Sequence, residues 1–337
     1  MSQPFISIIV VAYNYEKLLP RALEAIKKQT YKDFEAVLVN NGSTDDTQGV
    51  IDDFALNNPN IRVVKVFVEK NQGVFLGRNQ GIEAATGQFI MFNDADDWME
   101  PDCLEKLSVS AKENNADKIC GAFKEIDTEG KQLRIVNFTS DYSKWFTVSL
   151  QATLFRRTIV MENNIRFHQS WLDDIDFNTQ FNYFTGGFAI VNEPVYDYYV
   201  NQHSTSGAKV KKKAWTYLDL QHDMLELFVP MIEKIVGQDK TDLSYLMVKQ
   251  YYFYLFHSNR YSTFGEFVEN YKAANKMMLE YMPNYLKDRY ERHLRKNSER
   301  KSGVMITKIF TNAERIHCMK FVMWMYLIAS KVTYLNP

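Results

Sequence analysis

The fold of this chain is decided by residues 88–98, which read QFIMFNDADDW. Residues 88–92 predict a buried β-strand, because they form an apolar run of strand length. The strand runs directly into three carboxylates, Asp94, Asp96 and Asp97. Their mutual repulsion is costly unless a cation or hydrogen-bond donors offset it. The stretch therefore indicates either a site for Mg²⁺ or Mn²⁺, which prefer oxygen ligands and phosphates, or a capping turn before the next helix.

Strands and helices alternate along the first third of the chain. We expect further strands at residues 5–11, 35–39 and 61–67, and helices at residues 16–29, after residue 45, at 75–85 and at 101–114. Gly87 is expected to end the third helix, as a residue that tolerates a positive φ. This alternation predicts an α/β fold with a Rossmann-like, mostly parallel sheet flanked by helices.

Polar clusters follow three of these strands, at residues 12–14, 40–43 and 94–97. In parallel sheets, ligands bind beyond the carboxyl ends of the strands. The three clusters therefore point to one binding crevice. In this crevice Tyr13 offers an aromatic face for a nucleobase, and Asn41 offers a side-chain amide for the edge of the base. The plainer interpretation of residues 41–45 is a helix cap.

The remaining chain divides into a mixed segment and a helical segment. We expect strands at 118–123, 133–138 and 189–199, helices at 152–163 and 174–184, and then helices at 218–236, 243–257, 264–281 and 305–332. The predicted organisation is an α/β domain at residues 1–207 and a helical C-terminal region at residues 208–337.

Composition excludes several classes of protein. The 337 residues contain 40 Lys and Arg against 41 Asp and Glu, which argues against a general nucleic-acid binder. The chain has neither a Gly-x-Gly-x-x-Gly stretch after the first strand nor a P-loop, so dinucleotide dehydrogenases and P-loop enzymes are excluded. The three cysteines are widely spaced and suit a reducing compartment. Lys17 is the first positive charge, which is atypical of a signal peptide, and we expect a cytoplasmic protein.

Two further features have both a functional and a plain interpretation. Asp173, Asp174 and Asp176 begin a predicted helix, where carboxylates are favourable caps, but one of them also suits a general base. His203 follows an aromatic strand, and a lone histidine is more often structural than a ligand. The six histidines show no paired spacing, so a zinc site is not expected.

Taken together, these motifs resemble the family 2 glycosyltransferases of the GT-A fold, mostly bacterial enzymes that build surface polysaccharide. The resemblance covers residues 4–207. It implies that residues 1–207 are the catalytic domain, in which residues 1–115 bind the nucleotide sugar and residues 116–207 bind the acceptor. It includes the segments PFISIIVVAYN at 4–14, QTYKDFE at 29–35, NNGSTD at 40–45, NQG at 71–73, RNQGI at 78–82, DADDW at 94–98 and DDIDF at 173–177. It implies an inverting enzyme that moves a sugar from a nucleoside diphosphate sugar to a hydroxyl of a glycan or a lipid-linked acceptor.

The resemblance also assigns roles to individual residues. Ala12, Tyr13 and Asn41 would form the base pocket, with Arg78 supporting the nucleotide and Asp94 near the ribose. By the same resemblance, Asp96 would hold Mn²⁺ or Mg²⁺ on the diphosphate, and His203 would touch the metal or the diphosphate. Asp174 would be the general base that takes the proton of the acceptor hydroxyl.

Two departures from the family pattern matter. Asn40-Asn41-Gly42-Ser43 replaces the usual Asp-Asp-Gly-Ser. Because an amide oxygen still accepts a hydrogen bond from uracil N3–H, UDP is favoured, although another base stays open. Asp173 stands where Glu is usual. Two alternatives remain: a GT-A-like nucleotidyltransferase, which usually has a Gly-rich basic loop after the first strand, and a non-catalytic nucleotide-sugar-binding protein, which would lack these carboxylates.

The C-terminal tail, residues 287–337, is basic. It has eleven Lys or Arg and four Asp or Glu, and it contains the apolar stretch 321–328. One interpretation is a helix that lies in an anionic membrane interface, which would make the protein peripheral at the inner face of the plasma membrane. The other is that this stretch packs within the protein.

Overall fold

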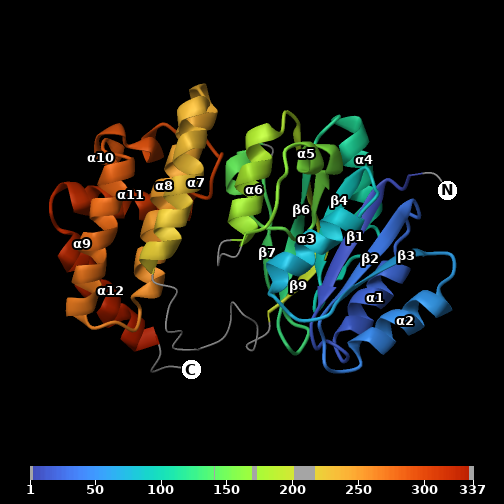
Figure 1. Ribbon diagram of the computed structural model, residues 1–337. Helices are drawn as coiled ribbons and strands as arrows, with labels where there is room; N and C mark the ends of the chain where they lie inside the picture. The colour runs from blue at the N-terminus through green and yellow to red at the C-terminus, as the bar shows by residue number, and fades with distance from the viewer. Residues whose placement is uncertain (1–2, 140, 169–172, 201–216, 334–337) are drawn as a thin grey trace. The chain divides into compact units, whose positions relative to one another are not determined.

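The structure is a computed structural model that describes residues 3–139, 141–168, 173–200 and 217–333. It divides into two compact units (Figure 1). The first comprises Met1–Ser140 with Thr147–Lys209, and the second comprises Asp141–Phe146 with Val210–Pro337. The domain boundary expected after residue 207 lies outside the described residues and stays a prediction.

The first unit is built on a mixed, mostly parallel sheet. Among the described residues the sheet has nine strands in the order β3-β2-β1-β4-β8-β6-β9-β5, with β7 paired to β6. The four N-terminal strands run parallel and confirm the expected core of the sheet: β1 (Ile6–Ala12), β2 (Phe34–Asn41), β3 (Arg62–Val68) and β4 (Phe89–Asp94). The others are β5 (Trp98–Met99), β6 (Lys118–Ile126), β7 (Gln132–Val136), β8 (Thr153–Arg156) and β9 (Phe188–Tyr199).

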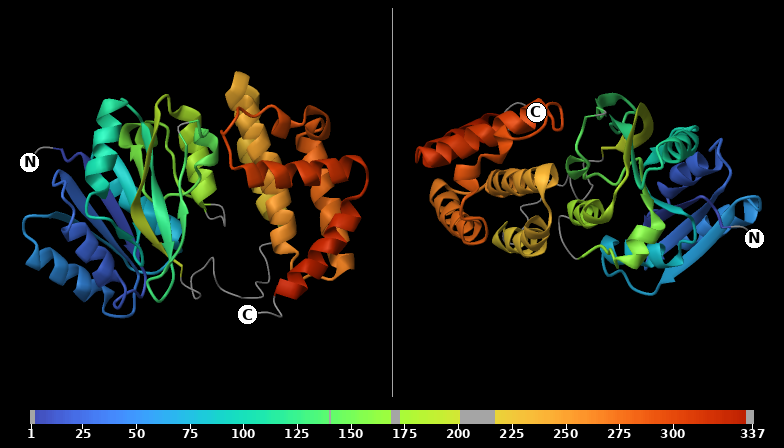
Figure 2. Two further views of the ribbon diagram at one scale, coloured as in Figure 1. Left: turned by 180° about the vertical axis from the view of Figure 1, so that it is seen from behind. Right: turned by 90° about the horizontal axis from the view of Figure 1, so that it is seen from above.

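Helices cover both faces of this sheet (Figures 1 and 2). One face carries α3 (Val74–Ala84), α5 (Arg157–Glu162) and α6 (Asp173–Phe184), and the other carries α1 (Leu19–Lys27), α2 (Thr47–Asn57) and α4 (Cys103–Glu113). The expected fold class is therefore confirmed. Pro20 lies in the first turn of α1, where its missing N–H leaves no hydrogen bond unmade.

Three expectations about local structure were wrong. Residues 153–156 form β8 rather than the start of a helix, because Leu154 and Phe155 fill a fully buried position between β4 and β6. Gly87 does not end α3 with a positive φ, since the helix already ends at Ala84. A side chain at Gly87 would place its Cβ 2.7 Å from the backbone nitrogen of Ser7, so close approach explains this glycine.

The third concerns residues 305–332, which were expected to form one helix. They belong to two helices, α11 (Lys301–Arg315) and α12 (Met319–Thr333). The break falls at His317, whose φ of 59° is left-handed and cannot continue an α-helix.

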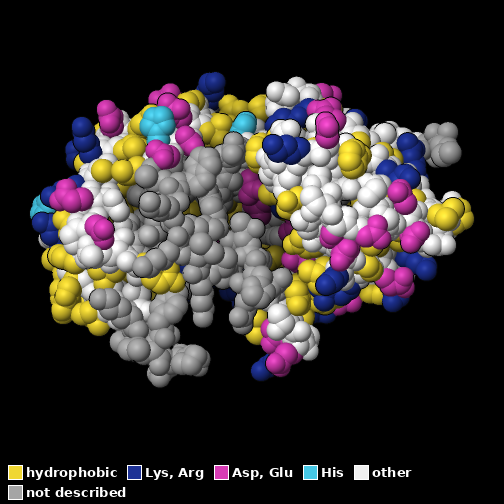
Figure 3. All heavy atoms as spheres, turned by 60° about the horizontal axis from the view of Figure 1, so that its bottom comes forward, with side chains coloured by type: hydrophobic (Ala, Val, Ile, Leu, Met, Phe, Trp, Pro, Cys, Tyr) yellow, Lys and Arg dark blue, Asp and Glu magenta, His cyan; other side chains and the backbone are white. Residues whose placement is uncertain are grey.

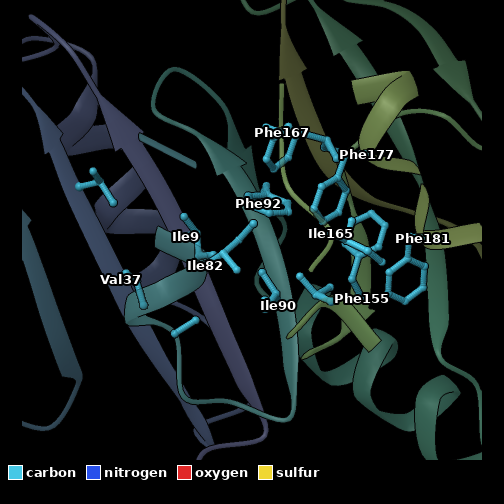
Figure 4. Packing of buried hydrophobic residues seen from close by; sticks show 14 residues of the cluster. Ile9, Val37, Ile82, Ile90, Phe92, Phe155, Ile165, Phe167, Phe177 and Phe181 are labelled. Atoms are coloured by element: carbon cyan, nitrogen blue, oxygen red, sulfur yellow. The ribbon is translucent and has the colours of Figure 1, made fainter. Parts of the chain in front are cut away.

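A cluster of buried aromatic and aliphatic side chains joins α6 to the sheet (Figure 4). The rings of Phe167 and Phe177 are stacked with centroids 4.3 Å apart, and the ring of Phe92 meets both at nearly right angles. Phe181 packs in the same way on Phe155 of β8. Because Phe92 lies two residues before Asp94, and Phe177 three after Asp174, this packing fixes the start of α6 beside the end of β4.

The second unit is helical, as expected. Its remaining elements are α7 (Tyr217–Lys234), α8 (Gly237–Ser258), α9 (Phe264–Tyr281), α10 (Tyr285–Asp288) and two 3₁₀ turns, η1 (Lys144–Phe146) and η2 (Tyr290–Arg292). The sequence did not predict that residues 141–146 belong here. Ser143 Oγ donates to Asp242 Oδ2 at 2.5 Å, and Trp145 Nε1 donates to Asp239 Oδ1 at 3.0 Å. Across the described residues, we find no helix with the length and apolar character needed to cross a membrane.

Candidate active site

The register of the parallel strands brings the polar clusters together. Ala12 is paired with Asn40, and Val11 with Asp94, so the carboxyl ends of β1, β2 and β4 lie level with one another. Ala12 is buried at the end of β1, and the side chain of Tyr13 is 40% exposed just beyond it. An aromatic face is therefore available at this edge of the sheet.

Hydrogen bonds tie the turn after β1 to the loop after β2. The backbone N–H of Asn14 donates to Ser43 Oγ at 3.0 Å, and the N–H of Thr44 donates to Asn14 Oδ1 at 2.8 Å. Asn14 takes a left-handed φ of 58°, which asparagine tolerates better than most residues. These bonds hold the loop after β2 against the turn that contains Tyr13, and the two segments together form one wall of the candidate site.

Asn41 has a buried oxygen that accepts no hydrogen bond. Its Nδ2 donates to the carbonyl oxygen of Gly73 at 3.1 Å and to Asn71 Oδ1 at 3.3 Å, which sets the orientation of the amide. Asn41 Oδ1 is buried and lacks a partner among the described residues. An unsatisfied buried acceptor costs about 1–3 kcal/mol, so this oxygen is suited to a ligand N–H.

Arg78 connects three carboxylates from different parts of the chain. Its Nη1 lies 2.7 Å from Asp173 Oδ2 and 3.0 Å from Asp174 Oδ1, and its Nη2 lies 3.1 Å from Asp94 Oδ1. Gln151 Nε2 donates to the other oxygen of Asp94 at 3.2 Å. The end of β4 and the start of α6 are therefore held together by a single buried guanidinium.

Asp173 and Asp174, the first two residues of α6, have pKa values that are raised toward neutral pH. Burial raises the pKa of Asp174 to about 7, with the charge of Arg78 opposing the rise and those of Asp173 and Asp94 adding to it. Burial likewise raises the pKa of Asp173, against the opposing charge of Arg78. The Asp174 side chain is still 35% exposed, so a hydroxyl group can reach a carboxyl whose pKa lies near neutral pH.

Asp96 and Asp97 have different environments. Burial and the charge of Asp94 raise the pKa of Asp96 to about 6, and Tyr15 Oη donates to Asp96 Oδ2 at 3.4 Å. Asp97 is fully buried and accepts hydrogen bonds from Tyr196 Oη at 2.9 Å and from the N–H of Tyr199 at 2.8 Å. Asp97 therefore anchors the acidic turn to β9, while Asp96 remains available to a ligand.

The donor set fits a divalent cation only in part. No group of three or more His, Cys, Asp or Glu side chains is arranged to hold a metal within the part of the chain that the structure describes. His203 lies outside the described residues. What the structure offers is the carboxylate of Asp96 beside Asp94, whose repulsion a cation would relieve. Such a site fits a cation that takes its other ligands from phosphate oxygens and water.

Several residues at this site were not singled out from the sequence. Tyr15 and Gln151 contact the acidic residues through side chains that carry no local motif. Arg21 donates to the backbone oxygen of Asp96 at 2.6 Å, and its guanidinium stacks 4.0 Å over the ring of Trp98. No sequence signal marks these three residues, because each contact depends on the fold.

Comparison with known proteins identifies the family. Residues 7–175 match the sequence model of the protein family described as glycosyl transferase family 2. The chain belongs to this family. The matched segment runs from β1 to the start of α6, so it contains both Asp94 and Asp174.

Relatives in this family come from several bacteria. The EpsH protein of Bacillus subtilis is 28% identical over 220 residues, which are 60% of this chain and 63% of that protein. The uncharacterized glycosyltransferase YibD of Escherichia coli is 28% identical over 252 residues, 68% of this chain and 70% of that protein. A cholesterol galactosyltransferase of Borreliella burgdorferi is 26% identical over 225 residues, 60% and 62% of the two chains. The chain thus spans a little under two thirds of the EpsH and Borreliella proteins.

Solved structures agree on the fold. A crystal structure of S. aureus TarS in complex with UDP matches with a TM-score of 0.70 and 18% identity, over 96% of this chain and 91% of that chain. The TarS complex with UDP-GlcNAc matches with a TM-score of 0.68 over the same shares. At this identity the likeness concerns the fold alone, and it includes the helical C-terminal region.

Proposed function

We propose that this chain is an inverting glycosyltransferase that moves a hexose or N-acetylhexosamine from a nucleoside diphosphate sugar to an acceptor hydroxyl. The acceptor would be a glycan or a lipid-linked sugar in polysaccharide biosynthesis. The observation that carries the proposal is the junction of β4 and α6, where Arg78 holds Asp94 next to Asp174. Membership of glycosyl transferase family 2 supports the same reaction class.

A UDP-sugar is the donor that this base pocket favours. Tyr13 offers a face for stacking, and the unpartnered Asn41 Oδ1 matches the N3–H of uracil. The loop connections through Asn14 hold these two features in one wall. Solved structures show TarS, a structural neighbour, in complex with UDP and with UDP-GlcNAc, and this supports a uridine nucleotide here.

The proposed chemistry uses opposite sides of the sugar. Asp174, with a pKa of about 7, takes the proton of the acceptor hydroxyl as the new bond forms. A general base is most effective when its pKa lies near the working pH. Asp96 would hold Mn²⁺ or Mg²⁺, together with His203, and the cation would neutralise charge on the departing diphosphate. Asp94, which Arg78 and Gln151 hold by hydrogen bonds, would accept a hydrogen bond from the ribose.

A cytoplasmic location is part of the same proposal. Cys103, Cys120 and Cys318 are all unpaired, which suits a reducing compartment.

A donor screen tests the proposed function. The full chain would be incubated with UDP-glucose, UDP-galactose, UDP-GlcNAc and GDP-mannose in the presence of Mn²⁺, and release of the free nucleotide would be measured. We expect one UDP-sugar to be hydrolysed slowly, and Asp174→Asn to abolish acceptor-stimulated release. Release from GDP-mannose alone would show that the donor is not a UDP-sugar. Pyrophosphate release from UTP and a sugar phosphate would favour a nucleotidyltransferase.

A further inference from the structure

Helix α12 has two apolar faces, one buried and one exposed to solvent. Met319, Met323 and Leu327 are buried in the second unit. Phe321, Trp324, Met325 and Ile328 are exposed, with 61% of Phe321 and 48% of Trp324 accessible. Their spacing of three and four residues places them on one side of the helix. The stretch 321–328 therefore packs internally through one face and leaves a row of large apolar side chains uncovered on the other.

Helix α11, which packs against α12, adds to this surface. Met305, Ile306 and Ile309 are exposed on it, and Ile316 is exposed in the turn between the two helices. Ile306 also lines a cavity of about 270 Å³ between α11 and α8, together with Phe253, Phe256 and Phe310. We name the exposed side chains the α11–α12 face: Met305, Ile306, Ile309, Ile316, Phe321, Trp324, Met325 and Ile328.

The charges around this face are positive. Lys301, Lys308 and Lys320 are exposed on the same two helices. Glu314 is the only acidic residue after Glu299 in the sequence, and it is buried, where it accepts a hydrogen bond from Tyr271 Oη at 3.0 Å. No exposed carboxylate therefore lies on α11 or α12 among the described residues. Figure 3 shows hydrophobic side chains gathered on part of the surface of the second unit.

We propose that the α11–α12 face binds the surface of a lipid bilayer that contains anionic lipids. Exposed Trp and Phe with flanking Lys are typical of helices that lie in the membrane interface. Lysines near such a surface strengthen binding by attraction to anionic headgroups. Each of these helices has 15 residues in the described part of the chain, fewer than the ~20 that a bilayer span needs, so the proposed contact is with the bilayer surface. This surface belongs to the second unit and the proposed catalytic residues belong to the first, and the proposal does not depend on which donor or acceptor is used.

A second copy of the chain is a weaker occupant for this face. If two copies packed face to face, Lys301, Lys308 and Lys320 of one copy would meet the same lysines of the other. No exposed carboxylate of α11 or α12 is present among the described residues to compensate for their repulsion. Charge complementarity thus favours an anionic partner over a self-complementary dimer.

Co-sedimentation of the full chain with vesicles tests the proposal. Vesicles of phosphatidylcholine alone and with 30 mol% phosphatidylglycerol would be compared at roughly 50 mM and 500 mM NaCl, a range over which charge attraction is progressively screened. We expect binding to the anionic vesicles at low salt and a loss of at least about tenfold at high salt. Failure to sediment with anionic vesicles at low salt overturns the proposal.

Two sets of variants locate the contact. The double variant Phe321→Ser with Trp324→Ser should weaken vesicle binding by about tenfold or more. The matched control, Leu56→Ser with Val236→Ser, should leave binding unchanged, although Leu56 and Val236 are more exposed, at 77% and 82%. Lys301, Lys308 and Lys320 changed to Glu should weaken binding by about 100-fold or more, since each lysine lost costs roughly fivefold and the new carboxylates are repelled. The matched control changes the exposed Lys131, Lys240 and Lys276 to Glu.

Two outcomes would overturn the assignment of this face. Equal binding by the α11–α12 variants and their controls would show that lipid is bound elsewhere. A concentration-dependent dimer that these variants abolish, without vesicle binding by the wild type, would show that a second copy covers the face. Because every variant replaces an exposed side chain, circular dichroism is expected to show unchanged folding, and nucleotide release from a sugar donor should be unaffected in detergent-free buffer.

Discussion

Replacing Arg78 with glutamine tests how the proposed base is controlled. The Arg78 side chain is 8% exposed and lies 2.7 Å, 3.0 Å and 3.1 Å from Asp173, Asp174 and Asp94. Its charge opposes the rise that burial causes in the pKa of Asp174, which stands at about 7. A neighbouring cation lowers a carboxyl pKa by about 1 to 3 pH units. In Arg78→Gln we therefore expect the pKa of Asp174 to rise to about 8 or above.

The consequence is a pH-dependent loss of transfer. Only ionised Asp174 accepts a proton, so the rate rises with pH through its pKa. At pH 7 the ionised fraction falls from about one half to about one tenth or less when the pKa rises by 1 to 3 pH units. Arg78→Gln should thus lose at least about fivefold at pH 7, and its loss relative to the wild type should become smaller as the pH rises toward 9.5. The assay is nucleotide release with saturating donor and acceptor between pH 5.5 and 9.5.

Controls separate this effect from misfolding and from donor binding. Arg78→Lys keeps a positive charge and should keep the midpoint near that of the wild type. Arg166→Gln removes a partly buried arginine that pairs with Glu83 rather than with Asp94, Asp173 or Asp174, and it should leave the profile unchanged. Thermal melting checks folding, and calorimetry measures the affinity for UDP. If Arg78→Gln lost the same fraction of its rate at every pH, with the wild-type midpoint, Arg78 would not act through Asp174.

Three further predictions concern single roles. Asp174→Asn should keep the affinity for UDP but lose transfer by about 100-fold or more, while Asp173→Asn loses less; the reverse ranking in steady-state kinetics would reassign the base. Asn41→Ala should weaken UDP binding by about fivefold, and calorimetry with N3-methyl-UDP should show no difference between Asn41→Ala and the wild type, since neither can form the bond to N3–H. Mn²⁺ should bind tightly only when UDP is present, and Asp96→Ala should abolish this tight binding even in the presence of UDP. Equal affinity of the wild type for UDP with and without EDTA would contradict the metal role.

The central strands were readable from the sequence because parallel strands are buried on both faces. β1 and β4 are near-continuous apolar runs, and the structure shifts their predicted ends by only one or two residues. β8 was missed because nothing local distinguishes residues 153–156 from a helix. Their strand conformation depends on pairing with β4 and β6, which lie far away in the sequence.

The candidate site shows the same division between local and distant information. Motifs placed Asp94, Asp96 and Asp174 at the ends of elements, and this needs only the sequence. The sequence could not show that Arg78 pairs with Asp173, which lies 95 residues further along the chain. Nor could it show that Asp97 accepts hydrogen bonds from Tyr196 and Tyr199. Three adjacent carboxylates look equivalent in a motif, but their partners give Asp94, Asp96 and Asp97 separate environments.

The distribution of charge gives a physical reason to expect a cation at this site. Arg78 is already shared by three carboxylates, so its positive charge is not free to neutralise a diphosphate. The side chain of Arg21 is likewise engaged, with the backbone oxygen of Asp96 and the ring of Trp98. A diphosphate placed beside Asp94 and Asp96 would meet net negative charge and be repelled. A divalent cation that binds together with the nucleotide reverses this balance, which explains why donor affinity should depend on metal even though the described residues form no metal cage of their own.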